Sequence, residues 1–261
     1  MNLKIEIIGL PASGKTFFYN HLKKKLNSQK KNYIRTINLR NSFIKQYLKT
    51  KTTKSLLKKY AYKIYIKNFQ IKSKFLFNKE YEDLNMFIKD NFKKNKNYNK
   101  ILLLYKKYIN SSDYSAERKS RMLKNFEVDL IGFKFLDNNF NFSVFDEGFF
   151  QKIFFKFEYK NNFKFSLNKQ IKYLKLVPKP DLIFFFDTNI KTCLERSKKR
   201  KDGFLYDNNF IKKSKNDYFY KSIISFSKLK KITIIKLNGN SSLSKNYKIF
   251  LRTIKNYKNK K

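Results

Sequence analysis

The residues best suited to chemistry form one short segment near the start of the chain, Gly9-Leu10-Pro11-Ala12-Ser13-Gly14-Lys15-Thr16. It fits the pattern G-x-x-x-x-G-K-[ST], in which successive backbone N–H groups wrap a polyphosphate and glycine leaves room for the anion. The lysine is expected to reach the β- and γ-phosphates of ATP, and the threonine hydroxyl is expected to bind Mg²⁺. The predicted nucleotide-binding residues are Gly9, Pro11, Ala12, Ser13, Gly14, Lys15 and Thr16.

A strand and a helix must flank this segment for the pattern to bind phosphate. Leu3–Ile8 is an apolar run typical of a buried strand, and Phe18, Leu22 and Leu26 recur at helical spacing after Lys15. Such a helix directs its positive N-terminal end at the same anion. The local sequence therefore predicts strand, loop and helix in the required order.

Two acids follow another predicted strand, Asn141–Phe145, which runs into Asp146-Glu147-Gly148. An acid at the tip of a strand beside the loop can order Mg²⁺, and Asp146 fits this role. In one reading Glu147 polarises a water molecule for ATP hydrolysis. In the other, one of the two acids accepts the proton of an acceptor hydroxyl, as in a kinase. Asp146 and Glu147 are therefore catalytic candidates in either chemistry.

Arginine is scarce, with seven among the 61 basic residues, so its positions are informative. Arg196 and Arg200 lie four residues apart, on one face of a helix predicted from about 189 to 199. Two guanidinium groups there would close over a transferring phosphoryl group and stabilise its charge. They are predicted to be catalytic, together with Lys15.

Four further arginines are predicted to contact the phosphoryl acceptor. They are Arg35 and Arg40, at the end of a second strand, and Arg118 and Arg121, three apart on a helix. The single histidine, His21, and the single cysteine, Cys193, are expected to pack in the core.

The formal net charge of the 261-residue chain is +42, which raises the question of a nucleic-acid partner. The excess lysine is spread over every segment, whereas a specific nucleic-acid site would cluster its cations. A small anionic substrate is the favoured partner, because a basic surface concentrates anions. With one cysteine and no apolar run of about 18 residues, we expect a cytoplasmic protein without a membrane span.

The order of the remaining elements predicts an α/β fold. Strands are expected at 33–39, 181–186 and 232–237, with helices between them, so the sheet should be parallel, five-stranded and covered by helices. Residues 41–139 show no strand-like alternation and are predicted to be a large helical insertion after the second strand. We expect residues 1–261 to form a single domain that includes this insertion.

The chain resembles the nucleoside and nucleoside-monophosphate kinases of the P-loop class, in particular their thymidylate-kinase-like branch. The matching residues are Gly9–Thr16, Asp146-Glu147-Gly148, Pro180–Asp187, Leu194–Arg200 and Ile232–Asn238. The resemblance implies ATP with Mg²⁺, a mobile arginine-bearing lid, and an acceptor between the loop and the insertion. The chain departs from this group after the third strand, where an arginine usually follows the acid, so the acceptor could be a nucleoside, a nucleotide or a sugar-like alcohol.

A small-molecule kinase is therefore the leading hypothesis from the sequence. The alternative is a P-loop ATPase or nucleotide switch that acts on nucleic acid or on a protein partner.

Overall fold

The computed structural model describes residues 3–28, 86, 90, 96–110, 115–135, 142–145, 148–152, 167–199 and 218–259. The chain divides into two compact units, which are described separately. The first comprises Met1–Arg35, Ser111–Asp113 and Phe140–Lys261. The second comprises Thr36–Asn110 and Tyr114–Asn139.

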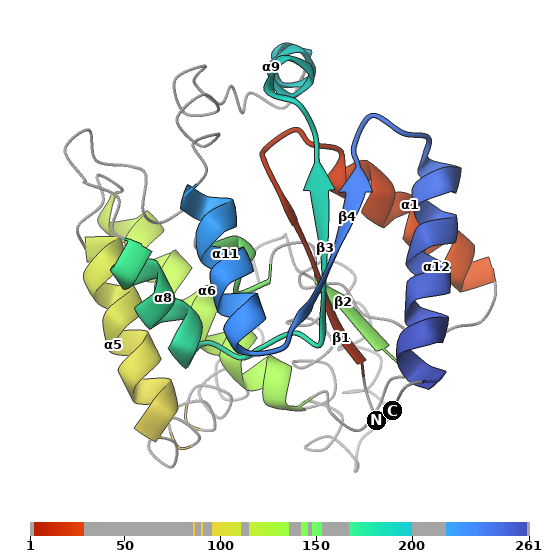
Figure 1. The fold of residues 1–261 in the computed structure, drawn as a ribbon. Coiled ribbons are helices and arrows are strands. Elements are labelled where there is room, and N and C mark those ends of the chain that lie inside the picture. Colours follow the sequence, from red (N-terminus) through yellow and green to blue (C-terminus); the bar gives the residue numbers. More distant parts are fainter. Residues whose placement is uncertain are drawn as a thin grey trace, which may run out of the picture. The chain divides into compact units, whose positions relative to one another are not determined.

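The first unit is built on a sheet of four described strands in the order β2-β1-β3-β4 (Figure 1). Their bounds are Leu3–Gly9 for β1, Phe142–Phe145 for β2, Leu182–Asp187 for β3 and Thr233–Asn238 for β4. All three neighbouring pairs are parallel. Because parallel strands end at the same edge, the carboxyl end of β1 has β2 on one side and β3 and then β4 on the other.

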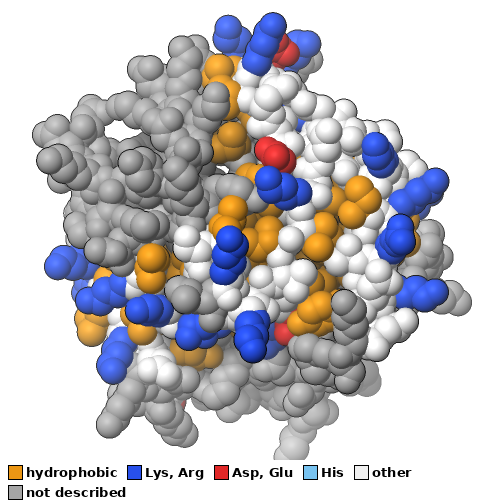
Figure 2. All heavy atoms as spheres, in the orientation of Figure 1, with side chains coloured by type: hydrophobic (Ala, Val, Ile, Leu, Met, Phe, Trp, Pro, Cys, Tyr) orange, Lys and Arg blue, Asp and Glu red, His pale blue; other side chains and the backbone are white. Residues whose placement is uncertain are grey.

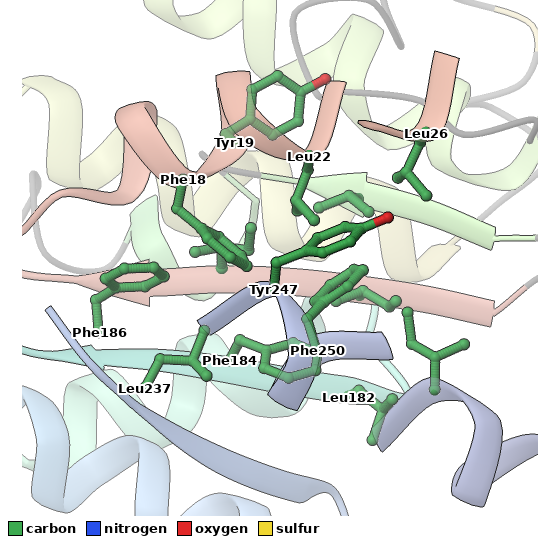
Figure 3. Close-up of a cluster of buried hydrophobic side chains, with 14 of the residues drawn as sticks. Phe18, Tyr19, Leu22, Leu26, Leu182, Phe184, Phe186, Leu237, Tyr247 and Phe250 are labelled. Carbon is green, nitrogen blue, oxygen red and sulfur yellow. The ribbon is translucent and has the colours of Figure 1, made fainter. Parts of the chain in front are cut away.

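One face of this sheet is covered by α1 (Lys15–Ser28) and α12 (Leu243–Asn259). The side chains of Ile5 and Ile7 on β1 point to this face, as their alternation along the strand requires. Figure 3 shows the aromatic core between the layers, where the ring centroids of Phe18 and Phe186 are 5.2 Å apart and those of Phe184 and Phe250 are 4.8 Å apart. Burial of these rings supplies the main force that holds α1, and with it the end of β1, in place.

The other face carries α8 (Leu167–Leu176) and α11 (Tyr218–Leu229), and α9 (Ile190–Lys198) follows β3 at the carboxyl edge (Figure 1). Helix α8 was not expected from the sequence. Its buried positions are Gln170, Tyr173 and Leu174, and Val177 directly after the helix continues their helical spacing. The apolar pattern is incomplete because its first member is a glutamine.

The predicted parallel, helix-covered sheet is confirmed for the four described strands. The strand expected at 33–39 lies outside the described residues, so the fifth strand stays a prediction. The strands expected at 3–8, 141–145, 181–186 and 232–237 are found to within one residue at each end. No helix in the described parts of the chain has the length and apolarity to cross a bilayer.

In the second unit, α5 (Lys96–Asn110) packs against α6 (Ala116–Phe135). The rings of Tyr105 and Phe126 stack with their centroids 3.7 Å apart and nearly parallel. These helices agree with the helical character expected for this part of the chain. The organisation of residues 41–139 as an insertion within a single domain stays a prediction.

Candidate functional site

The segment that joins β1 to α1, residues 9–16, forms a tight loop that we call the glycine loop. Gly9 has φ +151° and Gly14 has φ +100°, both in the region that side chains rarely adopt. Ala12 between them also has a positive φ of 59°. The N–H of Ser13 donates to the carbonyl of Leu10 at 3.2 Å and closes the turn. The loop therefore has the left-handed backbone that the spacing of its glycines requires.

Lys15 begins α1, and its ammonium group folds back over the loop. Its Nζ atom donates to the carbonyl oxygens of Gly9 at 2.6 Å and Leu10 at 2.7 Å. Thr16 follows in the first turn of α1 and is exposed. A cation and a hydroxyl thus lie at the N-terminal end of a helix, where anions are stabilised.

On its β2 side the glycine loop is held by Gln151, which is buried. The N–H of Gly9 donates to Oε1 of Gln151 at 3.0 Å, and Nε2 of Gln151 donates to the carbonyl of Gly9 at 3.1 Å. One side-chain amide thus pairs with both polar groups of one residue. Since the last paired residues of β1 and β2 are Glu6 and Phe145, this amide continues the pairing of β1 beyond that point.

Glu6 holds Gln151 in turn, from the middle of β1. Its Oε1 atom accepts the backbone N–H of Gln151 at 2.7 Å. Burial raises the pKa of the Glu6 carboxyl from 4.5 to about 7, against the opposing effect of the backbone N–H groups of Gln151 and Phe150 and the charge of Lys152. A Cβ atom on Gly148 would overlap the Glu6 carboxyl group. Glycine is needed at 148 for space, because this carboxyl lies directly against it.

On the β3 and β4 side, the carbonyl of Ser13 is the point of attachment. The hydroxyl of Thr188 donates to it at 2.9 Å, and Nη1 of Arg196 lies 3.4 Å from it. Both terminal nitrogens of Arg196 also donate to the carbonyl of Gly239 at 3.1 Å. A Cβ atom on Gly239 would overlap the Thr188 hydroxyl, so glycine permits the close approach of the turn after β4.

Helix α9 positions Arg196. The side chain of Asn189 caps the helix by accepting the N–H of Thr192 at 2.8 Å. Cys193 and Ser197 face inward, and burial raises the pKa of the Cys193 thiol to about 11 although the charges of Lys15 and Arg196 lower it. The prediction that Cys193 is a packing residue is confirmed. His21 is half-buried on α1, with its ring edge-on to Tyr247 at 5.5 Å.

Of the predicted site residues, the structure brings together the glycine loop, Lys15, Thr16 and Arg196. Arg118 and Arg121 lie on α6 in the second unit, and both are exposed. Five predicted site residues lie outside the described residues: Arg35, Arg40, Asp146, Glu147 and Arg200. Their predicted roles stay predictions.

Sequence reasoning did not identify Glu6, Gln151 or Thr188 as parts of the site. For Glu6 a signal exists, because a carboxyl in an otherwise apolar strand must find donors when it is buried. For Gln151 and Thr188 no comparable signal exists. Each contacts the glycine loop across more than 140 residues of sequence.

Within the described ranges, no group of three or more His, Cys, Asp or Glu side chains could hold a metal ion. Thr16 is the predicted Mg²⁺ ligand among these residues. Figure 2 shows Lys and Arg side chains scattered over the visible face and few acidic ones between them. This distribution resembles the even spread along the sequence more than the single basic track of a nucleic-acid site.

A parallel α/β sheet with a glycine loop between its first strand and first helix defines the architecture. No protein-family model matches the sequence, and no curated protein matches it significantly. The structure is similar to deoxyadenosine kinase from M. mycoides, with 12% identity, a TM-score of 0.45, and coverage of 98% of this chain and 100% of that one. It is also similar to thymidylate kinase from Candida albicans, with 15% identity, a TM-score of 0.49, and coverage of 100% and 94%.

Proposed function

We propose that this protein is an ATP- and Mg²⁺-dependent phosphotransferase that transfers the γ-phosphoryl group to a hydroxyl or phosphate acceptor on a small molecule. The observation that carries the proposal is the conformation of the glycine loop. Its backbone is left-handed at Gly9, Ala12 and Gly14, and α1 begins directly behind it with Lys15. This is the arrangement in which backbone N–H groups and one lysine grip a polyphosphate.

Lys15 would leave the carbonyl groups of Gly9 and Leu10 and bind the β- and γ-phosphates. The hydroxyl of Thr16 and the carboxylate of Asp146 would hold Mg²⁺, which neutralises charge on the phosphate oxygens. Asp146 or Glu147 would accept the proton of the acceptor hydroxyl. These roles follow from the residue types and from their places in the sequence, Lys15 and Thr16 directly after the glycines of the loop and the two acids directly after β2.

The position of Arg196 beside the glycine loop supports the proposal of phosphoryl transfer. Its Nη1 atom is 3.5 Å from the position that a Cβ atom on Gly14 would occupy. Together with Arg200 it would stabilise the negative charge that develops on the transferring group. Phosphoryl transfer depends on positioning and charge stabilisation more than on covalent chemistry, and a loop flanked by cations supplies both.

The acceptor is proposed to be a nucleoside, a nucleotide or a sugar-like alcohol, with Arg35, Arg40, Arg118 and Arg121 as its contacts. The planar guanidinium group recognises the oxygens of phosphate and carboxylate by paired hydrogen bonds. The high net charge of +42 favours the arrival of anionic substrates at low salt.

The test is incubation of the purified protein with MgATP and a panel of nucleosides, nucleoside monophosphates and sugars. The panel includes deoxyadenosine and thymidylate, after the two similar kinases. We expect ADP to appear together with one phosphorylated acceptor, identified by mass spectrometry. Lys15→Ala should reduce this transfer at least about a hundredfold. Lys24→Ala, which changes an exposed lysine of the same helix, should leave it unchanged. Hydrolysis of ATP without transfer to any acceptor would replace the kinase with the ATPase of the alternative hypothesis.

A further inference from the structure

A connected set of buried groups links the glycine loop to the segment that follows β2. Gln151 and Glu6 have exposed fractions of only 1% and 2%. Both lie outside the set of residues expected to touch a nucleotide. The Gln151 side chain bonds both polar groups of Gly9, and the Glu6 carboxyl accepts from the backbone N–H groups of Gln151 and Phe150. These contacts therefore hold the backbone of the glycine loop in its conformation.

The carbonyl of Gly9 is shared by two donors. It accepts from Nζ of Lys15 at 2.6 Å and from Nε2 of Gln151 at 3.1 Å. A carbonyl oxygen has two lone pairs and can accept both. When Lys15 turns toward a phosphate, the Gln151 amide still donates to this carbonyl. The lysine can therefore leave without depriving a buried acceptor of its hydrogen bond.

The N–H of Gly9 is held by the same side chain, through Oε1 of Gln151 at 3.0 Å. Both polar groups of the residue that opens the loop are thus fixed by one amide. The amide is fixed in turn because the backbone N–H of Gln151 donates to Glu6 and because Gly148 leaves room for that carboxyl. The N–H and the carbonyl of Gly9 belong to two successive peptide groups, so the one amide fixes the peptide that enters the loop and the peptide that follows it.

We propose that Gln151 and Glu6 are positioning residues of the glycine loop: the Gln151 amide fixes the two peptide groups on either side of Gly9 for polyphosphate binding, and the Glu6 carboxyl fixes Gln151. This inference rests on the proposed function, since it assigns a role in binding the nucleotide of that same site. It also gives a reason for the glycine at 148, directly after the two acids, and for the glutamine three residues further on. Gly148 and Gln151, which follow Asp146 and Glu147 in the sequence, are thereby tied to the loop.

Gln170 provides a matched control. Its side chain is fully buried on α8, as that of Gln151 is buried beside the loop, but neither of its amide atoms has a hydrogen-bond partner among the residues that the structure describes. Methionine has nearly the shape of glutamine without its polar atoms. Gln151→Met therefore removes the contacts to Gly9, whereas Gln170→Met removes a buried amide that makes no hydrogen bond.

The experiment measures MgATP binding by calorimetry and, with the acceptor that the wild type uses, KM for ATP and kcat. We expect Gln151→Met to raise the dissociation constant and KM about tenfold or more, because two buried hydrogen bonds to the loop are lost. Gln170→Met should stay within about twofold of the wild type, since its amide does not contact the loop. Equal affinity in the two variants would overturn the inference.

A second pair of variants keeps the test decisive if Gln151→Met does not fold. Glu6→Gln keeps an oxygen that can accept the N–H of Gln151 and should bind MgATP within about threefold of the wild type. Glu6→Met keeps the length without the acceptor and should lose affinity about tenfold. Equal binding by these two variants would also overturn the inference. A wild type that binds no MgATP would instead refute the proposed function, so the two failures are distinguishable.

Discussion

The two sides of the glycine loop are held by different kinds of contact. On the β2 side, buried neutral and acidic groups, Gln151 and Glu6, fix the Gly9 peptide. On the β3 and β4 side, the half-exposed guanidinium of Arg196 and the hydroxyl of Thr188 meet the carbonyl of Ser13. The polar side chains on the β2 side are buried from solvent, whereas the β3 and β4 side presents a cation at the surface.

This difference predicts that the two sides contribute differently to stability and to catalysis. Loss of a buried hydrogen bond leaves a desolvated group unpaired, and that costs more than loss of a contact that water can replace. The contacts of Gln151 and Glu6 should therefore contribute more to the stability of the loop than those of Arg196. Arg196 should affect stability less and catalysis more, because its charge can follow the phosphoryl group.

The largest effects are expected for Gly148→Ala and Gly239→Ala. At 148 the added methyl group would overlap the buried Glu6 carboxyl, so we expect a loss of about 3 kcal/mol in the free energy of unfolding. At 239 it would overlap the buried Thr188 hydroxyl and the backbone carbonyl of Ser13, so the loss should be at least as large. Urea denaturation followed by circular dichroism measures both. A loss below about 1 kcal/mol for Gly148→Ala would contradict the close contact between residue 148 and Glu6.

The next effect is a pH dependence that comes from Glu6. Burial raises the pKa of its carboxyl to about 7 in the folded protein, from 4.5 when it is exposed. The folded state therefore binds the proton more tightly, and this contribution to stability is present below pH 4.5 and is lost as the pH rises through 7.

Glu6→Gln removes this titration. Relative to the variant, the wild type should lose about 2 kcal/mol of unfolding free energy between pH 5 and pH 8. Urea denaturation of both proteins at the two pH values gives the difference, and all other titrating groups cancel in it. Parallel stability profiles for the two proteins would contradict the account of Glu6 as a buried acid of raised pKa.

On the exposed side, Arg196→Lys should have a smaller effect on stability. The lysine cannot reproduce the paired contacts of the guanidinium group with the Gly239 carbonyl, but the site is half-exposed, so we expect a loss of about 1 kcal/mol or less. Under the proposed function, kcat should fall at least about tenfold while folding is nearly unchanged. Thermal denaturation and steady-state kinetics on one preparation test this, and a stability loss as large as that of Gly148→Ala would contradict it.

The smallest effect is expected at Ala12. Its positive φ of 59° is unfavourable for a residue with a Cβ atom, and Ala12→Gly should relieve that strain. Part of the gain is offset because glycine is more flexible in the unfolded chain, so we expect a stabilisation of about 0.5 kcal/mol. Thermal denaturation would reveal it as a small rise in Tm. A clear fall in Tm would mean that the methyl group packs in a way that outweighs the strain.

The elements that carry the loop were predictable because their signals are local. The apolar run of β1 and the helical spacing of Phe18, Leu22 and Leu26 identify strand and helix, and the two glycines identify the turn between them. Each of these signals arises from residues that are close in sequence, where backbone preference and burial act on the same few positions.

The supports of the loop were not predictable because they act over long separations. Gln151 meets Gly9, and Thr188 meets Ser13, only after the sheet has brought the ends of β2 and β3 beside β1. A polar residue has no periodic signal when its partner comes from a different part of the chain. Helix α8 was missed for a related reason, since Gln170 occupies a buried position in which an apolar residue is expected.

The proposed function depends on recognition of a polyphosphate by the glycine loop. Calorimetric titration of the wild type with MgATP, MgADP and AMP compares ligands that share the adenosine and differ in their phosphates. We predict saturable binding of one MgATP per chain and binding of AMP at least about a hundredfold weaker, because AMP lacks the phosphates that Lys15 and the loop N–H groups hold. Equal affinity for AMP and MgATP, or the absence of any saturable heat with MgATP, would contradict the assignment of residues 9–16 as a phosphate-binding loop.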